Sequence, residues 1–114
     1  MTVENLASKM ELELLVAGDL TRAVTGGYCG DLLSWVMGRA QEGDAWITVM
    51  GNVNAVAVAV LADTACIILA DSTALDEDAR LRAEQQGVCV LRSGKNQYEL
   101  CCALQAALGE GALI

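Results

Sequence analysis

Few residues in this sequence have the chemistry and spacing of a functional site. The chain has no histidine, and no serine or cysteine has an identifiable base partner, so nucleophilic and general-base catalysis lack their usual components. The segment Thr25-Gly26-Gly27-Tyr28 stands out because adjacent glycines permit a positive φ and let a ligand or another backbone approach closely. Its amides, followed by a helix start near Asp31, would suit an anion. A tight turn without a ligand is the alternative.

Two more segments follow predicted strands, where the loops of an open parallel sheet line the ligand crevice. Asn52 and Asn54 would supply amide donors and acceptors there, or they would only form a turn and cap a helix. Lys95 follows a later strand and is a candidate to neutralise a small anion. The predicted ligand site therefore contains Thr25, Gly26, Gly27, Tyr28, Asn52, Asn54 and Lys95.

Several other kinds of site do not fit the sequence. No Gly-Lys-Ser or Gly-Lys-Thr follows the glycine pair, and its spacing is not that of a dinucleotide fingerprint. Asp19, Arg22 and Asp31 bracket the same segment and suggest an ion pair that orients it. The acids at 76–78 are better explained as a helix start than as a magnesium site. We therefore predict no catalytic residue, no metal and no cofactor.

The five cysteines read as reduced thiols. Their odd number and the placement of Cys66 and Cys89 inside apolar runs argue against a disulfide framework. Metal ligation is the alternative, but there is no C-x-x-C pair. Cys29 differs from the others because it lies beside glycines in a predicted loop, where a thiol would be exposed and redox-responsive.

Composition narrows the class of partner. The 114 residues suit a single domain over 1–114, and a net charge of −8 would repel nucleic acid and anionic lipid. The N-terminus has no basic signal-peptide region, and the longest apolar run is too short for a membrane span, so we expect a cytoplasmic protein. The hydrophobic content is 54%, an excess that a homodimer interface would use.

Hydrophobic periodicity places these segments on alternating strands and helices. The run of alternating valine and alanine at 55–62 fits either type, and we predict a helix because a crossover must precede the next strand. The pattern predicts an α/β three-layer sandwich with a mostly parallel sheet of four to five strands. Helices are expected over 3–9, 31–40, 55–62, 76–86 and 98–108, and strands over 12–17, 22–28, 44–50, 65–70 and 88–91.

The most distinctive stretches resemble the DRTGG domain. They are Val24-Thr-Gly-Gly-Tyr28, Asp31-Leu-Leu-Ser-Trp-Val-Met37, Gly43-Asp-Ala-Trp-Ile-Thr48 and Ala65-Cys-Ile-Ile-Leu69. The resemblance implies a fold like the N-terminal domain of HPr kinase/phosphorylase and a homodimerising regulatory or interaction module. We expect this chain to be a stand-alone DRTGG domain, which departs from larger relatives that carry further domains. It supplies no catalytic residue, and the name-giving motif survives only loosely at 19–27.

Two hypotheses of function follow, and neither assigns an enzymatic activity to the chain. In the first, the chain is a homodimer that docks on a protein partner through the apolar surface around Trp35, Val36 and Met37 or through the closing helix. In the second, it senses a nucleotide or a small phosphorylated metabolite, such as an acyl phosphate, in a crevice formed by Gly26-Gly27 and Asn52-Asn54.

Overall fold

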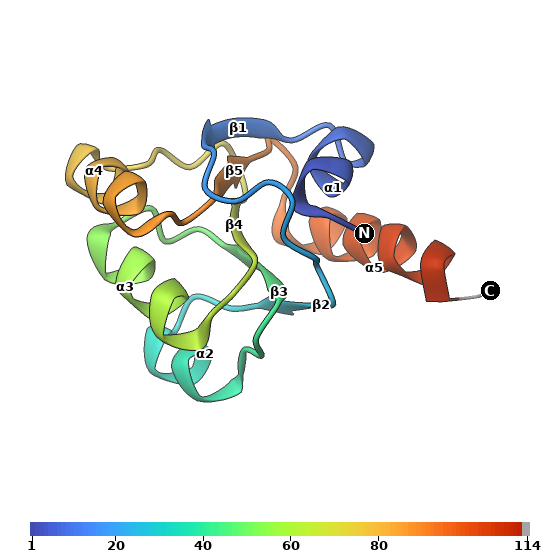
Figure 1. Cartoon of the computed structure of the whole chain (residues 1–114), viewed down its shortest axis with the longest axis horizontal. Helices are drawn as coiled ribbons and strands as arrows, with labels where there is room; N and C mark the ends of the chain where they lie inside the picture. Colours follow the sequence, from blue (N-terminus) through green and yellow to red (C-terminus); the bar gives the residue numbers. More distant parts are fainter. Residues whose placement is uncertain (113–114) are drawn as a thin grey trace.

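The computed structural model describes residues 1–112 as a five-stranded sheet between two layers of helices (Figure 1). The helices are α1 (Val3–Lys9), α2 (Leu33–Arg39), α3 (Val53–Ala62), α4 (Glu77–Gln86) and α5 (Gln97–Ala112). The strands are β1 (Glu13–Val16), β2 (Gly26–Cys29), β3 (Asp44–Thr48), β4 (Cys66–Leu69) and β5 (Val90–Arg92). The predicted α/β fold class is thereby confirmed.

The sheet runs in the order β1-β5-β4-β3-β2. Strands β2 to β5 are parallel and lie side by side in chain order, joined by α2, α3 and α4. Strand β1 is antiparallel to β5, with Glu13 opposite Arg92. This arrangement makes β2 one edge of the sheet, and α5 packs against β2 and β3.

Alternating side chains of the central strands build a core on each face of the sheet. Ala45 and Ile47 of β3 join one cluster, which also contains residues of α1 and α5. Trp46 faces the other cluster, under α2, α3 and α4. All five residues of β3 are buried, as expected for a parallel strand covered on both sides.

The end signals read from the sequence account for several helices. Thr2 and Asn52 accept hydrogen bonds from the amides of Asn5 and Ala55, so the side chain of each caps its helix. Gly87 ends α4 in the left-handed conformation. The ambiguous run 55–62 is helical. Within residues 1–112, no helix combines the length and apolar character needed to cross a bilayer.

The structure differs from the sequence-based prediction around β2 and α2. The strand predicted over 22–28 begins only at Gly26, because the segment before it crosses over α1, where the Val3 amide donates to the Arg22 carbonyl. Asp31 was expected to cap α2, but Leu32 is the N-cap residue and no side chain caps the helix.

Candidate functional site

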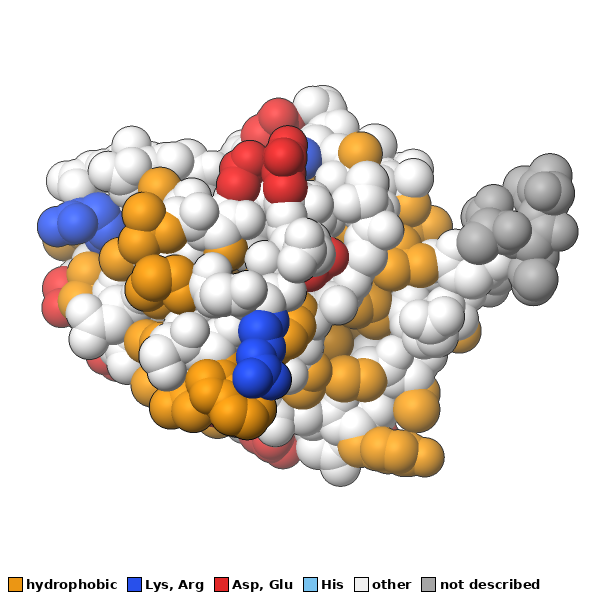
Figure 2. Space-filling model, turned by 90° about the horizontal axis from the view of Figure 1, so that it is seen from below, with side chains coloured by type: hydrophobic (Ala, Val, Ile, Leu, Met, Phe, Trp, Pro, Cys, Tyr) orange, Lys and Arg blue, Asp and Glu red, His pale blue; other side chains and the backbone are white. Residues whose placement is uncertain are grey.

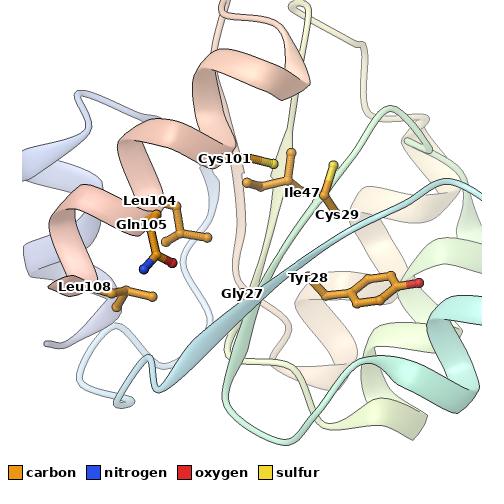
Figure 3. Close-up of a pocket in the computed structure, with 8 residues that line it drawn as sticks. All are labelled: Gly27, Tyr28, Cys29, Ile47, Cys101, Leu104, Gln105 and Leu108. Atoms are coloured by element: carbon orange, nitrogen blue, oxygen red, sulfur yellow. The ribbon is translucent and has the colours of Figure 1, made fainter. Parts of the chain in front are cut away.

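A small cavity lies between the edge strand β2 and helix α5 (Figure 3). Its volume is about 160 Å³. The backbone of β2 forms one wall, and one face of helix α5 forms the other. Ile47 of β3 lies between the two walls. The lining residues are Gly27, Tyr28, Cys29, Ile47, Cys101, Leu104, Gln105 and Leu108.

Gly27 is required at this wall because α5 packs directly on it. A Cβ atom at this position would lie 2.5 Å from Cδ2 of Leu104, closer than packed carbon atoms approach. At Gly26, a Cβ would lie 2.7 Å from Oδ1 of Asp44. The glycines therefore allow close packing, and neither is among the glycines with positive φ, which are Gly18, Gly43 and Gly87. The tight turn given as the alternative to a ligand site is not formed, because the pair lies in strand β2, and the positive φ that glycine permits is not used there.

Thr25 and Tyr28 flank the glycines and face away from the cavity. Thr25 is exposed, and its hydroxyl donates to the Glu42 carbonyl at 3.4 Å. The Tyr28 ring points to the opposite side of the sheet from α5 (Figure 3), where it packs against the cluster beneath α2 to α4. Of the predicted segment, only Gly27 and Tyr28 line the cavity, and Tyr28 lines it without its ring.

The structure does not bring the other predicted site residues to this cavity. Gly26 and Gly27 begin β2 beside Asp44, whereas Asn52 follows the far end of β3. The side chain of Asn52 is used to cap α3, and Asn54 is exposed on the first turn of that helix. Lys95 is exposed in the turn between β5 and α5. The predicted crevice that combined the glycines with the asparagines is therefore not assembled, because the two pairs lie at opposite ends of parallel strands.

Asp31 lies at the carboxyl end of the strands. Its Oδ1 atom accepts hydrogen bonds from the Thr48 hydroxyl at 2.8 Å, the Val49 amide at 2.9 Å and the Gln97 side-chain amide at 3.0 Å. This carboxylate ties the loop after β2 to the loop after β3 and to the start of α5. It therefore takes up donors that would otherwise be available to an anionic ligand at this edge.

These contacts set the charge state of Asp31. Burial alone would raise the pKa of its carboxyl, but the hydrogen bonds from Val49, Gln97 and Thr48 stabilise the ionised form and bring the pKa below its ordinary value. Asp31 is therefore a fixed negative charge near the end of β2.

Two thiols face each other across the cavity, those of Cys29 on β2 and Cys101 on α5 (Figure 3). Burial, the neighbouring Cys101 thiol and the charge of Asp31 together raise the pKa of Cys29 to about 12. Cys29 is nevertheless solvent-exposed, as the sequence predicted, but it ends strand β2 and does not lie in the predicted loop.

The ion pair expected among Asp19, Arg22 and Asp31 is not formed. The Arg22 guanidinium instead binds Asp63 at the end of α3, donating to Oδ1 at 2.8 Å and to the carbonyl at 2.6 Å. Asp19 accepts hydrogen bonds from the amide and hydroxyl of Thr21. Sequence proximity misled the prediction, because the true partner of Arg22 lies 41 residues away.

Sequence reasoning missed the half of the cavity that α5 supplies. The residues concerned are Cys101, Leu104, Gln105 and Leu108. Their spacing of three, four and seven residues places them on one face of a helix, so the periodicity of α5 contained the signal. Nothing in the sequence showed that this face would pack on β2.

A second feature is the apolar surface of α2 to α4, which we define by Leu32, Trp35, Met37, Val60, Leu61 and Leu81. Each of these side chains is at least 43% exposed, and Leu61 is 69% exposed. Arg39 stacks on the Trp35 ring at 3.7 Å from its centre. A groove of about 270 Å³ runs between α3 and α4, bordered by Leu61 and Arg82. Val36, predicted to contribute to this surface, is fully buried and belongs to the core.

A metal site is not among the features found. Over residues 1–112, no group of three or more histidine, cysteine, aspartate or glutamate side chains is arranged to hold an ion.

Comparison with known proteins shows that the fold is similar to a solved structure. It contains the CBS and DRTGG domains of the regulatory region of Clostridium perfringens pyrophosphatase, complexed with the activator diadenosine tetraphosphate. The TM-score is 0.70 at 9% sequence identity, and the match covers 90% of this chain and 45% of that one. This chain therefore spans less than half the length of its structural neighbour. No protein-family model and no curated protein matches the sequence. The likeness supports the predicted DRTGG-like fold.

Proposed function

We propose that this chain is a non-enzymatic regulatory module that self-associates through the apolar surface of α2 to α4. Two observations support the proposal. Its fold is similar to that of a regulatory region in another protein. Most of its large exposed hydrophobic side chains lie on or beside neighbouring helices, since α3 contacts both α2 and α4. The absence of histidine from the sequence supports a role other than acid–base catalysis.

The exposure of this surface is the observation that carries the proposal. Figure 2 looks onto the side of the molecule that carries α2 and α3 at the bottom of Figure 1, and hydrophobic side chains gather there beside basic ones. Trp35 and Leu61 are each more than half exposed. Soluble monomers rarely leave contiguous apolar patches uncovered, and such patches mark interaction sites.

A second copy of the chain is the partner that best fits this surface. Two copies with a net charge of −8 each repel one another, so the contact between them must be apolar and must avoid the acidic regions. The surface contains Arg39 and borders Arg82, and it meets this requirement. A twofold contact would pair each surface with its equivalent.

The test is sedimentation equilibrium of the wild type and two matched variants. Leu61→Lys places a charge on the apolar surface, whereas Tyr98→Lys makes the same change at a 78% exposed side chain on α5. We expect a wild-type dimer in the micromolar range, dissociation constants raised at least tenfold by Leu61→Lys, and no change with Tyr98→Lys. A monomeric wild type would overturn self-association, and disruption by Tyr98→Lys alone would move the interface to α5.

A second candidate function is ligand sensing, which the cavity beside Gly27 and Tyr28 supports. Its volume of about 160 Å³ equals that of roughly five water molecules, and drug-sized ligands occupy pockets of about 300 Å³ or more. None of the described lining residues is a lysine or arginine. The cavity therefore favours a small uncharged group over a nucleotide or acyl phosphate.

Thermal unfolding with a panel of nucleotides, acyl phosphates and small uncharged molecules tests this candidate. A ligand at one hundred times its dissociation constant adds about 2.7 kcal/mol and raises the midpoint of a small domain by roughly 10 °C. An upward shift with any member of the panel would support sensing. The absence of a shift throughout would leave self-association as the function of the module.

A further inference from the structure

The paired thiols at the cavity have a geometry that the proposed self-association does not use. Cys29 lies on the last position of β2, and Cys101 lies on the second turn of α5. The two residues stand on elements that pack directly on each other, and both line the cavity, with their sulfur atoms near the same end of it (Figure 3). Cys29 is exposed and Cys101 is half-buried, so a small reagent in solvent can reach the pair.

We propose that Cys29 and Cys101 form an oxidative modification site, in which a low-molecular-weight disulfide converts the two thiols into one intramolecular disulfide bond. The oxidant class is that of oxidised glutathione, a disulfide small enough to approach an exposed cysteine. The modification is independent of the apolar surface of α2 to α4, because the two thiols lie on the cavity between β2 and α5, and α5 packs on the opposite face of the sheet from α2 to α4.

The reaction is two successive thiol–disulfide exchanges. One cysteine thiolate attacks a sulfur of the small disulfide, which forms a mixed disulfide and breaks the original sulfur–sulfur bond. The second cysteine thiolate then attacks the protein sulfur of the mixed disulfide, forming the Cys29–Cys101 bond. Two molecules of the small thiol leave and take up the two protons that the cysteines lost. The protein is oxidised by two electrons, and the small disulfide is reduced by two.

The other cysteines do not offer an equivalent pair. Cys66 and Cys89 interact with each other in the core, but they are only 0% and 2% exposed, so an oxidant cannot approach them. Cys102 is exposed and follows Cys101 directly. Consecutive positions on a helix point about 100° apart, and Cys102 does not line the cavity that contains Cys29 among the residues described. Cys102 is therefore the natural control.

The bond would fasten α5 to the edge strand of the sheet. Because it joins residues 29 and 101, it would close a loop that contains most of the chain and restrict the unfolded state accordingly. It would also link the two walls of the cavity, which β2 and α5 form. Oxidation should therefore raise the unfolding midpoint by several degrees while leaving the layers of the fold in place.

The experiment uses the full chain, incubated for hours with excess oxidised glutathione at pH 8.5 and then alkylated, digested and analysed by mass spectrometry. We expect a peptide pair joined through Cys29 and Cys101 and the loss of two of the five free thiols. Cys102→Ser should behave like the wild type, and Cys101→Ser should retain glutathione on Cys29 without closing a bond. A sedimentation measurement of the oxidised protein distinguishes an intramolecular bond from a link between two copies.

Three outcomes would overturn the proposal. They are a bond from Cys29 to Cys102, a bond only between separate copies, and mixed disulfides that do not proceed to an intramolecular bond in the wild type. Peptide mapping of the wild type is decisive even if a serine variant fails to fold.

Discussion

The Thr48 hydroxyl donates a 2.8 Å hydrogen bond to Oδ1 of Asp31 and thereby joins the end of β3 to the loop after β2. The same hydroxyl accepts a hydrogen bond from the Met50 amide at 3.2 Å. Both partners lie at the carboxyl end of the parallel strands, where ligand crevices usually open in such sheets. In this chain, the position is used to hold the loops together.

Replacing Asp31 tests that role. Asp31→Ala leaves the buried Thr48 hydroxyl and the Val49 amide without their acceptor, and we expect the free energy of unfolding to fall by about 2 kcal/mol or more. Asp76→Ala is the control, because the Asp76 side chain makes no capping hydrogen bond. Urea unfolding of both variants at pH 7 provides the measurement, and equal losses would contradict the account.

The stability should also depend on pH through Asp31. Because the folded-state pKa of this carboxyl lies below its ordinary value of 3.8, its contribution is complete above that value. The contribution is lost as the pH falls from 3.8 through the lower folded-state pKa. We expect Asp31→Asn to flatten part of the acid-induced loss of stability below pH 4. Parallel curves for wild type and variant would show that Asp31 contributes nothing to it.

Two buried threonines should respond oppositely to the same substitution. The hydroxyl of Thr64 is buried without a hydrogen-bond partner among the described residues, whereas that of Thr48 has two. We expect Thr64→Val to stabilise the fold by about 1 kcal/mol and Thr48→Val to destabilise it by about 1 to 2 kcal/mol. Chemical denaturation gives both values, and a loss with Thr64→Val would mean that its hydroxyl is satisfied in solution.

Gly27 should be intolerant of a side chain for a reason unrelated to ligands. A Cβ atom at this position would lie 2.5 Å from Leu104. Gly27→Ala should therefore lower the free energy of unfolding by about 1 to 3 kcal/mol, because the added methyl group overpacks the contact. The control is Gly38→Ala in α2, where a Cβ atom has no neighbouring atom within 4 Å. This substitution should raise the free energy of unfolding by about 0.5 to 1 kcal/mol. In a Leu104→Ala background, the cost of Gly27→Ala should largely vanish, and a double-mutant cycle measures this coupling.

The raised pKa of Cys29 predicts its pH-dependent reactivity. Since the thiolate is the nucleophile and the pKa is about 12, the rate of alkylation by iodoacetamide should keep rising about tenfold per pH unit beyond pH 9. In Cys101→Ser, which removes the neighbouring thiol but retains Asp31, the rise should level off at lower pH. Free glutathione is the reference thiol. A plateau near pH 9 in the wild type would contradict the raised pKa of Cys29.

Much of the fold was predictable because its signals are local. The helix α1 begins and ends where the sequence predicted, since Thr2 and the apolar spacing of 3–9 act within one short segment. The buried strands β3 and β4 were evident as apolar runs. The helix at 55–62 required the further argument that parallel strands need a crossover.

The candidate site was less predictable because its contacts are distant in the sequence. Gly27 and Leu104 meet only after α5 packs on β2, and no local pattern encodes that contact. Asp31 looked like a helix cap because of its position, but its partners at Thr48, Val49 and Gln97 lie 17 to 66 residues away. The sequence correctly indicated that another group packs closely on the glycine pair. It did not indicate that this group is Leu104 at Gly27 and Asp44 at Gly26.

The pairing of β1 with β5 has a consequence for synthesis on the ribosome. Strands β2 to β5 can add to the sheet one after another as they emerge, because each pairs with the strand next to it in the chain. β1 emerges before them all, yet Glu13 must wait for Arg92, which lies 79 residues later. We expect nascent chains arrested before Val90 to remain open to protease cleavage at β1. The first strand to be made is thus the last to join the sheet.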